Sequence, residues 1–137
     1  MTKMKSRKEK CFCEPDEVLI FPCSGGSNVG QIANHAAMDL TALDKGKMYC
    51  LAGIGGKVSN IILTTKLAKK IVAIDGCPVH CARKTLEHAG IDVDVHVVVT
   101  ELKIEKRNDF FMDLDEINKV ANKVTAQLRN KNKCQGG

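Results

Sequence analysis

Aromatic residues are scarce in this sequence of 137 residues, which has no Trp, one Tyr and four Phe. A buried core must therefore be built mainly from Val, Ile, Leu and Ala. The chain is long enough for one such core, since a domain of this size buries roughly two-thirds of the surface that its unfolded form exposes. A composition of 44% hydrophobic and 27% charged residues is that of a soluble globular protein.

The sequence also lacks any apolar stretch long enough to cross a membrane. Its basic start runs into residues 11–17, which hold three carboxylates, so the pattern of a secretory signal peptide is missing there. We therefore expect a cytoplasmic protein whose thiols stay reduced. In that compartment, seven cysteines indicate metal or thiol chemistry rather than a disulfide framework.

Positive charge is concentrated at the two ends of the chain. The net charge is +5, of which residues 1–10 carry +4 and residues 129–137 carry +3, so the body of the chain is slightly acidic. Basic ends of this kind are usually solvated, and we interpret residues 1–16 as a flexible arm and residues 129–137 as a tail. An acidic body with few aromatics argues against nucleic-acid binding.

Apolar runs alternate with helical periods from residue 17 onward. Four apolar runs are typical of strands in a sheet, at residues 18–21, 48–51, 71–74 and 93–100. Apolar residues at steps of three and four predict helices over residues 29–43, 58–68, 78–89 and 113–128. Strands that alternate with helices favour a mostly parallel sheet covered on both faces. The predicted fold over residues 17–128 is a single three-layer α/β/α domain with a Rossmann-like sheet of four or slightly more strands.

Pro78 predicts where the third helix begins. Proline is favoured at the first position of a helix, so Cys77 is the expected N-cap. Cys81, four residues on, then lies on the same helical face. The partial positive charge of a helix N-terminus stabilises thiolates there.

Four cysteines lie at the ends of three predicted strands. Cys23 follows the first strand, Cys50 lies at the end of the second, and Cys77 and Cys81 follow the third. Because the carboxyl ends of parallel strands meet at one edge of a sheet, three separate segments deliver thiols to one rim. Four thiolates in a tetrahedron are typical of structural zinc, so we predict a metal-binding domain with these four ligands. Cu(I) or an iron–sulfur cluster would suit the same soft ligands.

A thiol-dependent enzyme is the alternative interpretation. Cys77 would be the nucleophile and Cys81 the resolving thiol of a redox or sulfur-transfer reaction, with Asp75 or His80 as proton carrier. The absence of a Cys-x-x-Cys motif counts against it. No role is assigned to three cysteines near the chain ends or to three histidines interpreted as isolated, namely Cys11, Cys13, Cys134, His35, His88 and His96.

Three segments together resemble the DGC domain family, which is named for its Asp-Gly-Cys motif. They are residues 22–25 (Pro-Cys-Ser-Gly), 50–56 (Cys-Leu-Ala-Gly-Ile-Gly-Gly) and 75–82 (Asp-Gly-Cys-Pro-Val-His-Cys-Ala), within a resemblance that spans residues 18–105. The resemblance implies zinc binding by four chelating cysteines, which match Cys23, Cys50, Cys77 and Cys81. It implies no reaction, and the sequence leaves the metal, any substrate or partner and the oligomeric state open.

Overall fold

A parallel sheet of four strands organises the chain: β1 (Val18–Pro22), β2 (Lys47–Met48), β3 (Lys70–Asp75) and β4 (Val95–Val98). The strand order is β2-β1-β3-β4, and every pairing is parallel. The structure is a computed structural model that describes residues 18–136, with side chains up to residue 130. The predicted α/β class and four-stranded parallel sheet are confirmed.

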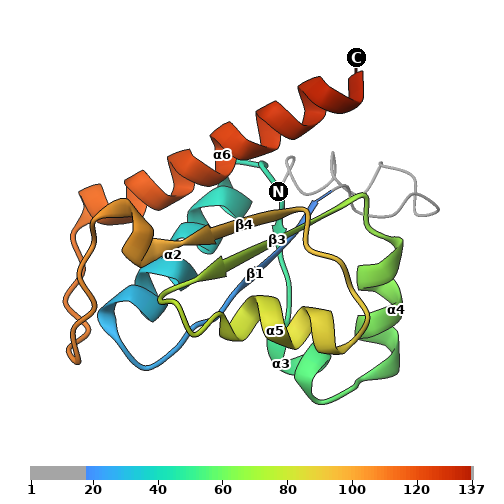
Figure 1. Cartoon of the computed structure of the whole chain (residues 1–137), viewed down its shortest axis with the longest axis horizontal. Helices are drawn as coiled ribbons and strands as arrows, with labels where there is room; N and C mark the ends of the chain where they lie inside the picture. Colours follow the sequence, from blue (N-terminus) through green and yellow to red (C-terminus); the bar gives the residue numbers. More distant parts are fainter. Residues whose placement is uncertain (1–17, 137) are drawn as a thin grey trace, which may run out of the picture.

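Helices cover both faces of this sheet. They are α2 (Asn28–Ala42), α3 (Leu51–Gly55), α4 (Ser59–Leu67), α5 (Cys81–His88), the 3₁₀ helix η1 (Val99–Leu102) and α6 (Leu114–Gly136). Figure 1 shows α2 and α6 on one side of the sheet and α3 and α5 on the other, with α4 beside α3. None of the helices within the described residues is both long enough and apolar enough to span a bilayer.

The two central strands are buried on both faces, as their continuous apolar sequences predicted. One set of strand side chains packs with α2 and α6, namely Ile20, Val72, Ile74, Val95 and Val97. The alternate set packs with α3 and α5, namely Leu19, Phe21, Ile71 and Ala73. The side chains of a strand alternate between its two faces, so β1 and β3 each contribute to both cores.

The segment after β2 folds differently from the prediction. The expected strand 48–51 stops at Met48, and the chain then forms α3, a short helix that was not predicted. Cys50 has extended backbone angles and is the N-cap of α3, because its Sγ accepts a hydrogen bond from the N–H of Gly53 at 3.3 Å. Ile54 is 1% exposed and joins the α3 and α5 core, so burial outweighs the poor helix propensity of glycine here.

The prediction that Cys77 caps the third helix is wrong. Residues 78 and 79 form a turn, and α5 begins at Cys81 after His80, whose backbone is left-handed with φ 62°. The cap comes instead from the end of β3, where the Asp75 carboxylate accepts the N–H groups of Ala82 and Arg83. A cap supplied from another element leaves no local signal in the sequence.

Two other boundaries also shift. The expected strand 93–100 is shorter, because β4 ends at Val98 and the chain turns into η1, where the fully buried Val99 packs in the core of α2 and α6. The last helix was expected to end at residue 128, and α6 continues to Gly136. The division into an arm, a domain over 17–128 and a tail stays a prediction.

Candidate thiol site

The four predicted cysteines lie where three neighbouring strands end. Cys23 follows β1 directly, Cys50 comes two residues after β2, and Cys77 comes two residues after β3. Cys81 is the first residue of α5. Because β1 lies between β2 and β3, Cys23 occupies the middle of this carboxyl edge. All four are free thiols, with Cys50 and Cys81 exposed and Cys23 and Cys77 half-buried.

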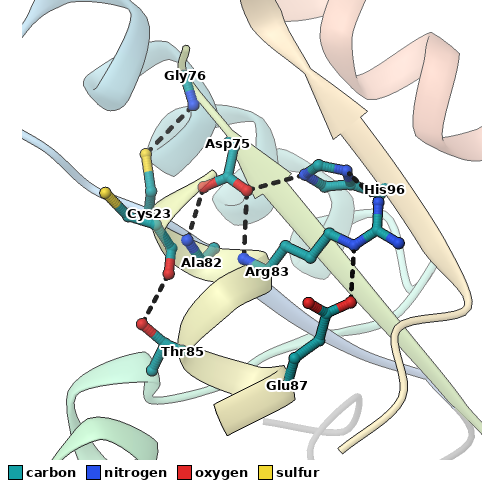
Figure 2. A network of polar contacts seen from close by, with 9 residues as sticks. Cys23, Asp75, Gly76, Ala82, Arg83, Thr85, Glu87 and His96 are labelled. Atoms are coloured by element: carbon teal, nitrogen blue, oxygen red, sulfur yellow. Dashed lines mark hydrogen bonds and ion pairs between the residues drawn. The ribbon is translucent and has the colours of Figure 1, made fainter. Parts of the chain in front are cut away.

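Cys23 connects the ends of β1 and β3. Its N–H donates to the carbonyl of Ile74 at 2.9 Å, and its Sγ accepts from the N–H of Gly76 at 3.3 Å (Figure 2). Burial raises the pKa of this thiol above its ordinary value, and the charges of Asp75 and Cys81 raise it further, against the opposing hydrogen bonds from Gly25 and Gly76. The Cys23 thiol therefore favours its protonated form. Cys81 lies close enough for its charge to raise the pKa of Cys23.

The other sulfurs have different surroundings. The Sγ of Cys77 lies 3.6 Å from the ammonium nitrogen of Lys106, a cation that stabilises negative charge on sulfur. The Sγ of Cys50 is occupied by its capping bond at the start of α3. Cys81 is exposed at the start of α5, and its carbonyl accepts the hydroxyl of Thr85 at 2.7 Å.

Four cysteine thiols are suitable ligands for a soft metal ion, but in this structure the four residues do not form a cluster of metal ligands. Among the residues with described side chains, no three Cys, His, Asp or Glu groups lie together as metal ligands would. The Sγ atoms of Cys23 and Cys50 each accept a backbone N–H instead. Ligation by all four would require these side chains to turn toward a common point.

A second network lies beside the thiols and is centred on Asp75. This carboxylate is 1% exposed. Its Oδ1 accepts the N–H of Ala82 at 2.7 Å, and its Oδ2 accepts the N–H of Arg83 at 3.2 Å and lies 2.8 Å from Nε2 of His96 (Figure 2). A carboxylate with these three contacts is suited to fixing the start of α5, and hence the backbone at Cys81.

The two histidines of this region lie together. The His80 and His96 rings meet edge to face, with centroids 4.8 Å apart. The other nitrogen of His96, Nδ1, lies 3.4 Å from a guanidinium nitrogen of Arg83. The ring of His80 therefore contacts the Asp75 network through His96, whose imidazole lies against the buried carboxylate.

The interpretation of His96 as an isolated residue is wrong, and a signal for its partner was present. In the parallel pairing of β3 with β4, His96 lies opposite Ala73 and Val98 lies opposite Asp75. Side chains two residues apart on a strand share a face, so Asp75 and His96 share one too. Recognising this required the strand order and the register, which the hydrophobic pattern alone does not supply. Cys11, Cys13 and the side chain of Cys134 lie outside the part of the chain that the structure describes.

Comparison with known proteins places these features in a family. The DGC domain model matches residues 19–124. The chain is also 36% identical to the anaerobic and virulence modulator AnvM of Pseudomonas aeruginosa over 95 residues, which are 68% of this chain and 72% of that protein. No solved structure matches the chain. With most of its length matched, including the Asp-Gly-Cys motif at residues 75–77, this chain belongs to the DGC domain family.

Proposed function

We propose that this protein binds zinc, or another soft metal ion, through the thiolates of Cys23, Cys50, Cys77 and Cys81. The observation that carries the proposal is the position of four free thiols at the carboxyl edge of one sheet, at the ends of three adjacent strands. Cysteine thiolates are the preferred ligands of structural zinc and of Cu(I). With all four bound, no open position remains for a reacting group, so the role would be structural, storage or delivery.

The surroundings of the thiols are consistent with this role. The ammonium group of Lys106 near Cys77 and the N–H of Gly76 near Cys23 would offset negative charge on the sulfurs. Asp75 holds the start of α5, which carries Cys81. When bound, the ion would supply the charge that keeps several thiolates together, while the chain fixes the segments from which they extend.

A substitution series tests the proposal. The protein is purified anaerobically, and its metal content is measured after replacing Cys23, Cys50, Cys77 and Cys81 with Ser, one at a time. One ion per chain is expected in the original protein, with a substantial loss of retention in each variant because all four ligands share the ion. Cys134→Ser is the matched control, since it removes a thiol from outside the proposed set. Metal content near zero in every preparation, including the original, would contradict metal binding.

A thiol-dependent redox or sulfur-transfer activity is the second candidate, and the contact between Lys106 and Cys77 favours it. A cation near sulfur stabilises the thiolate that attacks a disulfide or an electrophile. Cys77 would be the nucleophile and Cys81 the resolving thiol. His80, which precedes Cys81 in the chain and lies against His96, would be the proton carrier. Fast alkylation at Cys77 alone in metal-free protein, lost in Cys77→Ser, would support this candidate over zinc binding.

A further inference from the structure

A cavity of about 600 Å³ lies among α3, α4 and α5, in the helical layer rather than at the thiol edge. Its apolar lining includes the buried Ile54 and the half-buried Ile62 and Ala89. This volume falls within the range of small-molecule sites, which are usually apolar with a few polar groups that fix the orientation of the ligand. The cavity offers an apolar surface to a ligand from outside.

Three lysines from three different segments line the same cavity. Lys57 follows α3, Lys66 lies near the end of α4, and Lys84 lies in α5. No Asp or Glu lines the cavity. Within the described residues, none of these three ammonium groups has a carboxylate partner; the ion pair of Arg83 on the same helix is made with Glu87. Three like charges around one apolar hollow repel one another and are relieved by an anion.

We propose that this cavity binds an anionic amphiphile, a small molecule with an apolar body and a carboxylate or similar head group. The apolar body would cover the half-buried Ile62 and Ala89, and the head group would lie among the three lysines. An inorganic anion would leave the apolar lining in water. The lining has no Phe, Tyr or Trp ring on which a nucleobase could stack, and its imidazole, that of His88, belongs to an exposed residue. The proposal is independent of metal binding, because it uses none of the four cysteines.

Calorimetric titration with decanoate and with decanol, below the concentrations at which either aggregates, tests the proposal. Decanoate should bind about ten-fold or more tightly than decanol, because both present the same apolar chain and only decanoate carries a charge. Each of Lys57→Gln, Lys66→Gln and Lys84→Gln should weaken decanoate binding several-fold and leave decanol binding unchanged. Lys119→Gln, on α6 beyond the opposite face of the sheet, is the control and should have no effect.

Two further measurements keep the result interpretable. Ile62→Asn should weaken both ligands, since it removes apolar lining, and circular dichroism shows whether each variant is folded. If one of the three lysine variants fails to fold, the other two decide the outcome. Equal affinity for decanoate and decanol, no binding of decanoate, or unchanged binding in the lysine variants would overturn the proposal. Binding to phosphatidylglycerol vesicles without binding of monomeric decanoate would also overturn it, in favour of a membrane-facing surface.

Discussion

At the scale of single residues, the geometry of the thiol edge depends on Asp75. Its buried carboxylate accepts two backbone N–H groups at the start of α5 and contacts His96. In Asp75→Asn, one oxygen becomes an amide NH2 that faces other donors, so at least one donor loses its partner. A buried unsatisfied donor costs about 1–3 kcal/mol, and we expect the free energy of unfolding in urea to fall by that amount.

Asp92→Asn is the control for this substitution. Asp92 is exposed in the loop between α5 and β4, and a surface change of this kind is expected to stay within about 0.5 kcal/mol. If the protein binds metal as proposed, Asp75→Asn should also lower metal retention, because the segment that carries Cys81 is no longer fixed. A variant with unchanged unfolding and unchanged retention would show that Asp75 does not position this segment.

The raised pKa of Cys23 predicts a loss of stability in alkaline solution. Burial, followed by the charges of Asp75 and Cys81, holds this pKa above its ordinary value of 9.0. Below that value both the folded and the unfolded thiol keep their protons, and the full stability is present. As the pH rises, the unfolded thiol ionises first, and the free energy of unfolding falls until the folded thiol has ionised too.

The measurement is urea denaturation of chelator-treated protein at a series of pH values from neutral to alkaline. Cys23→Ser has no ionising group at this position, so its stability should decline less over the alkaline range. If the free energy of unfolding declined equally with pH in the two proteins, the buried Cys23 thiol would not be the cause of the alkaline loss of stability.

The cysteines could be predicted from the sequence, whereas their surroundings could not. Cys23 and Cys77 follow apolar runs and Cys50 lies at the end of one, and the rule that parallel strands end at one edge was enough to place all three at that edge of the sheet. His96 was missed because its partner, Asp75, lies 21 residues away on another strand. Side-chain contacts of this kind depend on register, and a one-residue shift in register moves every side chain of the strand to the other face.

At the scale of elements, the loop that carries Cys23 lies directly against the start of α2. A Cβ atom added to Gly30, in the first turn of that helix, would lie 2.5 Å from the carbonyl oxygen of Gly25. In Gly30→Ala, α2 and the loop must therefore move apart, and overpacking of this kind costs about 1–3 kcal/mol. We expect a lower free energy of unfolding and faster alkylation of Cys23, measured with a thiol reagent on chelator-treated protein.

Gly26→Ala is the matched control, because an added Cβ at Gly26 meets no atom within 4 Å. It adds the same methyl group in the loop itself without a clash, and should leave both the stability and the Cys23 alkylation rate close to those of the original protein. Equal effects of the two substitutions would mean that loop flexibility, rather than close packing against α2, controls access to Cys23.

Elements with a strong hydrophobic period were predictable, and those determined by distant contacts were not. α2 has buried residues at steps of three and four and a local cap from Ser27, whose Oγ accepts the N–H of Gly30, so its sequence contains its own signals. α3 is five residues long with two glycines and forms because Ile54 packs into a core. The start of α5 was predicted too early because Pro78 is a local sequence signal for a helix start. The side chain that caps α5 belongs to Asp75 in β3, and local sequence does not reveal this contact.

At the scale of the whole molecule, the sheet separates two aliphatic cores. One is formed with α2 and α6, the other with α3 and α5, and Cys23 packs against both while Cys77 packs against the first. Both cores consist of strand and helix side chains that pack against one another. The proposed metal site lies at one edge of this framework, so a bound ion would contribute to the stability of the loops rather than to the formation of the sheet.

If the protein binds a metal ion as proposed, this arrangement predicts that the fold survives its removal. Classical zinc fingers derive about 10–16 kcal/mol from the ion and are unfolded without it, because they have almost no core. Here we expect chelation at room temperature to leave the far-ultraviolet circular dichroism unchanged and to lower the melting temperature, since an ion present at 1,000 times its dissociation constant adds about 4 kcal/mol to the folded state. Adding zinc back should restore the melting temperature, and a variant with all four cysteines replaced by Ser should respond to neither treatment. Loss of helical signal on chelation would instead mean that the ion holds the sheet and helices together.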